Sequence, residues 1–100
     1  MKVILDNIDS LRMLCMEFHV GRLFVFGSVL NPSFDQESDI DFIVSFKKIK
    51  LEDYADNYFD FKFSLEDLFK REIDLLEEKA IKNPYLLKSI NSSKKLVYES

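Results

Sequence analysis

The chain has 100 residues, 47% of them hydrophobic and 14% aromatic, and carries a formal net charge of −4. Its length and apolar content predict a single domain, residues 1–100, with a core of its own. The acidic balance argues against direct nucleic-acid binding, which requires a basic stripe. No apolar run reaches the length of a membrane span.

The single cysteine, Cys15, can form no internal disulfide. The start of the chain does not resemble a secretory signal, because Asp6 and Asp9 interrupt its apolar residues. Both features predict a cytoplasmic protein. A domain of this size buries limited surface, which leaves room for a protein partner or a homo-oligomer.

Hydrophobic periodicity divides the chain into alternating helix and strand signals. The expected elements, in chain order, are a helix over residues 6–18, a strand over 22–26, a connection over 28–38, a strand over 39–46, a helix over 51–70, a strand over 71–76, a helix or helical pair over 77–91, and a short strand or docked tail at 96–98. This order predicts an α/β or α+β fold with a small mixed β-sheet flanked by helices.

Four further side chains need an interpretation: Cys15, His19, Phe59 and Phe63. Cys15 lies on the apolar stripe of the first helix, which favours core packing. The only histidine, His19, follows that helix and is interpreted as a turn residue rather than a catalytic group. Phe59 and Phe63 fall partly off the apolar stripe of the long helix, so they either widen its buried face or stay exposed for a partner.

Two carboxylates interrupt the apolar strand over residues 39–46. Asp39 and Asp41 are two residues apart, so their side chains lie on one face of the strand. Burying such charges without partners is costly. They can therefore sit at a strand mouth, where they reach water or cap a nearby backbone, or they can form a functional site.

A third carboxylate, Asp74, interrupts the next apolar strand and favours the functional interpretation. Three carboxylates from adjacent strands would form an oxygen-rich site suited to Mg²⁺ or Mn²⁺, which commonly bridge substrate phosphates. Gly27 and Ser28 follow the strand over residues 22–26 and open a possible helical turn. Free N–H groups at such a turn, with a serine hydroxyl, suit phosphate binding. Together these residues predict two-metal nucleotidyl transfer.

Gly27-Ser28, ten intervening residues and Asp39-Ile40-Asp41 resemble the signature of the DNA polymerase β-type nucleotidyltransferase superfamily. The small size and the later strand residue Asp74 resemble its minimal nucleotidyltransferase branch. The resemblance implies the nucleotidyltransferase fold, with Asp39, Asp41 and Asp74 as catalytic metal ligands. It further implies that Asp74 acts as general base and that Gly27 and Ser28 bind the triphosphate.

The resemblance also implies a partner and a substrate. Minimal nucleotidyltransferases commonly act as antitoxins of HEPN-domain toxins, and some transfer AMP from ATP to a tyrosine of the toxin. The expected function is therefore metal-dependent transfer of AMP from ATP to a partner hydroxyl. ATP as the preferred triphosphate comes only from the resemblance.

The chain differs from the family pattern just after Ser28. Members commonly carry Arg and Gly there, whereas this sequence has Val29-Leu30-Asn31, and no Lys or Arg occurs between Arg22 and Lys47. The triphosphate charge would then be met by metal ions and backbone N–H groups, helped by Lys47, Lys48 or a basic residue of the partner.

Two alternatives to protein adenylylation are open at this point. The chain can be a non-catalytic antitoxin that neutralises its partner by complex formation, which its aromatic-rich helix would support. It can also modify a small molecule, as antibiotic-modifying relatives do. Those relatives usually have an additional acceptor domain, for which 100 residues leave little room.

Overall fold

The computed structural model describes residues 1–32, 34, 35 and 37–100. In these residues a four-stranded sheet has the order β3-β2-β1-β4, with β2 and β3 parallel and the other neighbours antiparallel. The elements are α1 (Lys2–Asp6), α2 (Ile8–Glu17), β1 (Val20–Phe26), the 3-10 turn η1 (Gly27–Leu30), β2 (Ile40–Phe46), α3 (Leu51–Phe69), β3 (Ile73–Glu77), the 3-10 turn η2 (Glu78–Ala80), α4 (Pro84–Ser93) and β4 (Lys95–Glu99). The predicted mixed sheet with flanking helices is confirmed.

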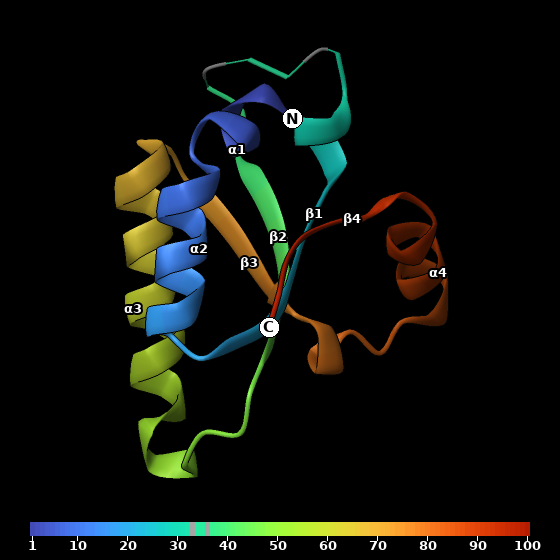
Figure 1. Ribbon diagram of the computed structural model, residues 1–100. Coiled ribbons are helices and arrows are strands. Elements are labelled where there is room, and N and C mark those ends of the chain that lie inside the picture. The colour runs from blue at the N-terminus through green and yellow to red at the C-terminus, as the bar shows by residue number, and fades with distance from the viewer. Residues whose placement is uncertain (33, 36) are drawn as a thin grey trace.

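The helices α2 and α3 pack side by side against one face of the sheet, whereas α4 stands on the other side (Figure 1). Alternation along the strands divides their side chains between these faces. On β1, Leu23 and Val25 are fully buried, and on β2 so is Phe42. Phe42 contacts Phe69 of α3 at a ring-centroid distance of 5.9 Å, so these residues face the helices.

The main hydrophobic core lies between the sheet and the helix pair. Each fully buried Leu, Ile or Phe side chain contributes about 1.5–3 kcal/mol to folding. Cys15 is completely buried in this core, which confirms its predicted packing role. The buried members of the core are Ile4, Leu11, Cys15, Val20, Leu23, Val25, Val29, Ile40, Phe42, Val44, Phe61, Leu65, Phe69, Ile73 and Leu75.

Two further buried apolar residues lie outside this core. Ile43 of β2 and Ile90 of α4 are 1% and 3% exposed, yet neither belongs to the main core. Asn83 fixes where α4 begins, because its side chain accepts hydrogen bonds from the N–H groups of Tyr85 and Leu86. Pro84 then occupies the first helical turn. The expected helical pair over residues 77–91 is therefore η2 and α4.

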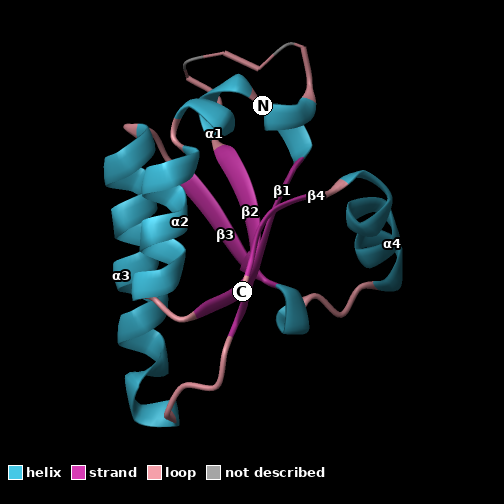
Figure 2. Cartoon of the chain, viewed as in Figure 1, coloured by secondary structure: helices cyan, strands magenta, loops and turns pink. Residues whose placement is uncertain are grey.

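Both chain ends are tied to the sheet region. The final segment is the strand β4, which pairs with β1, so the strand interpretation of the C-terminal residues is confirmed. The helix α1 was not expected from the sequence. It brings the N-terminal amine of Met1 to the carbonyl oxygen of Val29 at 3.0 Å, across η1. Figure 2 shows how the helices and the N-terminal segment surround the strands.

Phe59 and Phe63 stay exposed, at 50% and 59%, so they do not widen the buried face of α3. His19 is a turn residue with a positive φ of 60°. It lies before β1, at the opposite end from Gly27. Among the helices formed by residues 1–32, 34, 35 and 37–100, none combines the length and the hydropathy needed to cross a membrane.

Candidate nucleotidyl-transfer site

The parallel pairing of β2 with β3 brings two aspartates together. Asp41 and Asp74 are direct register partners, and neighbouring strands lie about 4.8 Å apart. The flanking residues Ile40 and Phe42 face the helices, so Asp41 points to the opposite face, toward the side of α4. Asp41 is half-buried, whereas Asp74 is exposed on the edge strand.

The third aspartate, Asp39, lies just before β2 and is exposed. Its spacing of two residues from Asp41 puts both side chains on the same side of the chain. Ser28 donates a hydrogen bond from its hydroxyl to the Asp39 carbonyl oxygen at 3.1 Å. The start of η1 is thereby fixed to the start of β2.

Gly27 is required where β1 ends and η1 begins. Its φ of 72° lies in the left-handed region, which glycine adopts without steric cost. A Cβ atom added to Gly27 would lie 2.5 Å from Oδ2 of Asp41. The backbone N–H of the next residue, Ser28, donates to the Asp41 carboxylate. The Gly-Ser pair is therefore in direct contact with the aspartate site, as the sequence pattern predicts.

The electrostatics of the site favour a bound cation. Burial raises the pKa of Asp41, and the charges of Asp74 and then Asp39 raise it further, while the hydrogen bond from the Ser28 N–H opposes the shift. The three carboxylates therefore repel one another across a shared face. A cation between them would remove that repulsion.

The donor set fits a hard divalent cation, because it consists of carboxylate oxygens. In the described part of the chain, no three His, Cys, Asp or Glu side chains are arranged around a common point as metal ligands. Asp39, Asp41 and Asp74 thus share a face but are not gathered around one point. Rotation of their side chains would be needed to enclose an ion.

Arg71 holds the loop that leads into the site, a role that sequence reasoning missed. Its Nη1 donates to the carbonyl oxygens of Asp35 and Ser38 at 2.9 and 3.0 Å. Its guanidinium lies 4.7 Å from the centre of the Phe34 ring. The segment that carries Asp74 is thereby tied to the segment that carries Asp39. No local pattern could reveal this contact, because its partners are 33 and 36 residues away.

Tyr58 attaches α3 to the strand that carries Asp74. Its hydroxyl donates to the carbonyl oxygen of Leu75 at 2.6 Å. Because β3 is an edge strand, this bond satisfies a backbone group that would otherwise face solvent. Burial raises the pKa of Tyr58, with smaller contributions from the charges of Glu77 and Asp74. The phenol therefore stays protonated and keeps its donor role.

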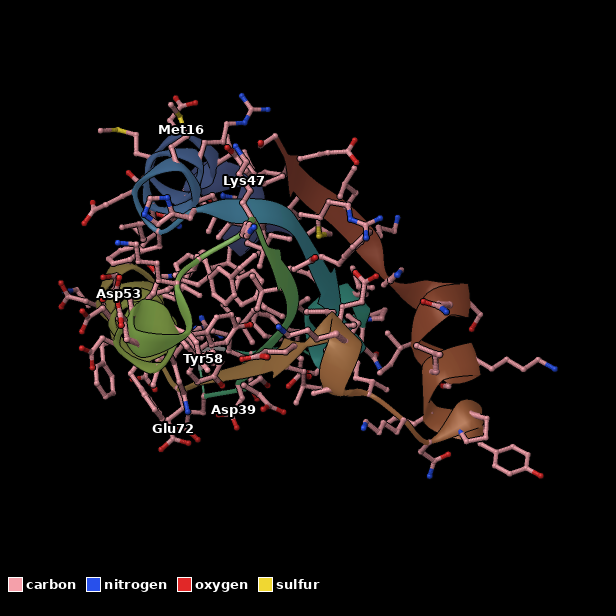
Figure 3. The ribbon with its side chains drawn as sticks, turned by 90° about the horizontal axis from the view of Figure 1, so that it is seen from below. Met16, Asp39, Lys47, Asp53, Tyr58 and Glu72 are labelled. Carbon is pink, nitrogen blue, oxygen red and sulfur yellow. The ribbon has the colours of Figure 1, made fainter. Side chains whose placement is uncertain are left out.

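The expectation that Lys47 or Lys48 helps to bind the triphosphate is wrong. Both follow the C-terminal end of β2, whereas Asp39 and Asp41 lie at its start. Six residues of extended strand separate Asp41 from Lys47, which is about 20 Å. Lys47 and Asp39 lie far apart in Figure 3. Closeness to the motif in sequence does not bring a basic residue to its end of the sheet.

Comparisons with known proteins agree with the geometry. Residues 10–100 match the family model described as "Polymerase beta, Nucleotidyltransferase". "Putative protein adenylyltransferase MJ0128" of Methanocaldococcus jannaschii is 35% identical over 102 residues, which cover 98% of this chain and 99% of that protein.

Solved structures show the same fold. A "putative minimal nucleotidyltransferase" superposes with a TM-score of 0.76 at 22% identity, over 94% of this chain and 92% of that one. A complex of tri-AMPylated Shewanella oneidensis HEPN toxin with MNT antitoxin matches with a TM-score of 0.60 at 12% identity, over 96% of this chain and 72% of that one. At these identities the likeness concerns the fold. The family match over most of the chain and the closely matched archaeal relative establish that this protein belongs to the polymerase β nucleotidyltransferase family and is a nucleotidyltransferase.

Proposed function

We propose that this nucleotidyltransferase transfers AMP from ATP to a tyrosine hydroxyl of a HEPN-domain toxin and acts as its antitoxin. The observation that carries the proposal is the register of Asp41 with Asp74 beside the Gly27-Ser28 turn. The name of the archaeal relative supports protein adenylylation. The complex of an AMPylated HEPN toxin with an MNT antitoxin, which shares the fold, supports the partner class.

Each residue of the site has a proposed role in this reaction. Asp39 and Asp41 hold Mg²⁺ or Mn²⁺, and Asp74 completes the metal site. A bound divalent metal would neutralise charge on the phosphate oxygens. Gly27 leaves space for the phosphates to approach the backbone, and Ser28 supplies a hydroxyl donor. Most of the catalytic effect then comes from position and electrostatics.

Asp74 is the proposed general base. It is exposed on an edge strand, so an acceptor hydroxyl of another protein can approach it from solvent. Asp74 takes the proton of that hydroxyl as its oxygen forms a bond to the α-phosphorus of ATP. The bond between the α- and β-phosphates breaks, and pyrophosphate leaves.

The test is transfer of label from α-labelled ATP, with Mg²⁺, to a purified HEPN-domain toxin. We expect the combined change Asp39→Asn and Asp41→Asn to reduce transfer to background. Asp53→Asn is the matched control, because Asp53 is an exposed aspartate at the start of α3, away from Asp39 (Figure 3). Continued transfer by the double variant would refute the assigned site.

A second candidate, neutralisation by binding alone, is favoured by one observation. Phe59 and Phe63 form an exposed aromatic pair on α3, with ring centroids 6.3 Å apart, and exposed aromatic surface is typical of protein contacts. In this case the aspartate variant would still neutralise the toxin. Mass spectrometry of the toxin would then find no added AMP.

A further inference from the structure

Lys94 is placed over the face of the sheet that carries the aspartates. The ammonium of Lys94 lies 4.1 Å from the centre of the Phe24 ring. Phe24 is the register partner of Ile43, and it alternates with Leu23 and Val25, which face the helices. The Phe24 ring and the Lys94 ammonium therefore lie on the face opposite α2 and α3.

The pairing of β1 with β2 sets the distance from Phe24, which lies beneath this lysine, to Asp41. Phe26 is the register partner of Asp41, and Phe24 lies two residues away on the same face. Diagonal neighbours of this kind are about 7–8 Å apart. The ammonium over Phe24 is thus within reach of a phosphate chain that begins at Gly27 and Ser28.

Two contacts hold Lys94 in position. Its backbone N–H ends α4 by donating to the carbonyl oxygen of Ile90 at 2.8 Å, and Ile90 is buried. The anchored helix end and the Phe24 ring together restrict where the ammonium can lie. A cation over an aromatic face is attracted by the ring's quadrupole.

The charge of Lys94 is available to an anionic ligand. No ion pair of the described residues includes Lys94. Arg22, the cation on the same face of β1, is paired with Glu78 at 3.2 Å. Between Arg22 and Lys47 the sequence has no Lys or Arg, so the strands that carry the motif provide no cation for a triphosphate.

We propose that Lys94 binds the β- and γ-phosphates of the nucleoside triphosphate and replaces the basic residue missing after Ser28. The proposal rests on the proposed function and assigns one more residue of the same site. It also explains how a motif that is acidic throughout can attract a polyanion: the cation comes from the C-terminal end of α4. Lys94 then contacts the leaving pyrophosphate rather than the transferred AMP.

The test is equilibrium binding of a non-hydrolysable ATP analogue and of AMP, each with Mg²⁺, measured by calorimetry. Loss of a hydrogen bond to a charged group corresponds to a change in Kd of about 10- to 100-fold. We expect Lys94→Ala to weaken binding of the triphosphate analogue by roughly tenfold and to leave AMP binding unchanged. Lys94→Arg should retain most of the affinity for the analogue.

Lys95→Ala is the matched control. Lys95 is the register partner of Val25, so it lies on the helix-covered side of β4. The Lys95→Ala protein should therefore bind both ligands as the wild type does. Lys94→Gln keeps much of the aliphatic chain over Phe24 and serves if Lys94→Ala does not fold. We expect the same selective loss from it.

Two results would overturn the role of Lys94. One is unchanged triphosphate affinity in Lys94→Ala or Lys94→Gln. The other is an equal loss for the analogue and AMP, since a structural lysine would affect both ligands. If either occurs while the Asp39 and Asp41 double variant still abolishes transfer, the proposed function stands and this inference fails. A wild-type protein that binds no triphosphate with Mg²⁺ contradicts both.

Discussion

The two faces of the sheet are built from alternate residues of the same strands, yet they differ in what stabilises them. The helix-covered face carries fully buried apolar side chains such as Phe42 and Leu23. The opposite face carries Asp41 and Asp74, whose charges repel each other. Because side chains alternate along a strand, Phe42 and Asp41 are neighbours in sequence but lie on opposite faces of the sheet. A variant can therefore be assigned to one face and tested for that face alone.

The largest expected effect is on the helix-covered face. Phe42 is completely buried and contacts the Phe69 ring, so Phe42→Ala should lower the free energy of unfolding by about 3–5 kcal/mol. Phe63→Ala is the matched control, because Phe63 is 59% exposed, and it should change stability by less than about 0.5 kcal/mol. Chemical denaturation measures both. Equal losses would show that the α3 surface is as tightly packed as the core.

Arg71 links the two halves of the aspartate face. Arg71→Ala removes two hydrogen bonds to the carbonyl oxygens of Asp35 and Ser38, and loss of a bond to a charged donor costs about 1.5–3 kcal/mol. We expect a lower kcat, because the loop that precedes Asp39 is released. Arg71→Lys should recover part of the activity, since one ammonium cannot reproduce the planar donor geometry of Arg. A drop in stability with unchanged kcat would limit Arg71 to folding.

The sequence predicted the aspartate face more completely than the residues that support it. A period of two placed Asp39 and Asp41 on one face, and an apolar strand interrupted by Asp74 indicated the third carboxylate. Both patterns are local. Arg71 acts through backbone groups that are distant in sequence, and the helix α1 reaches Val29 only in the folded chain. Such contacts depend on tertiary packing, so no spacing in the sequence encodes them.

The error over Lys47 and Lys48 has a related cause. These lysines are close to the motif in sequence, but an extended strand carries them to the other end of the sheet. Lys94 lies 53 residues after Asp41 in the sequence, but β4, which begins at the next residue, pairs with β1. In a small sheet, strand order decides which charges share a face.

Gly27 tests how tightly the Gly-Ser turn fits the aspartates. Gly27→Ala places a Cβ atom 2.5 Å from Oδ2 of Asp41 and forces alanine into a φ of 72°. A residue held in an unfavourable backbone region costs about 1–3 kcal/mol. We expect that loss in denaturation, together with reduced transfer, because the Asp41 carboxylate must move. Ser10→Ala, an exposed change on α2, should alter neither quantity.

The smallest expected effect has the opposite sign. Asp41→Asn removes one of three repelling charges and keeps an oxygen that can accept the hydrogen bond from the Ser28 N–H. Without divalent metal, the free energy of unfolding should rise by no more than about 1 kcal/mol, the size of an exposed charge interaction. Asp53→Asn should show no such gain.

Addition of Mg²⁺ should then make the wild type more stable than Asp41→Asn. A ligand that binds only the folded state raises the melting temperature, so Mg²⁺ should stabilise the wild type and have little effect on Asp41→Asn. Thermal unfolding with and without Mg²⁺ measures the difference. If Asp41→Asn is instead less stable without metal, the carboxylate serves mainly to cap the Ser28 N–H group. The aspartate face would then be stabilised by its own hydrogen bonds, as the strand-mouth interpretation of the acids requires.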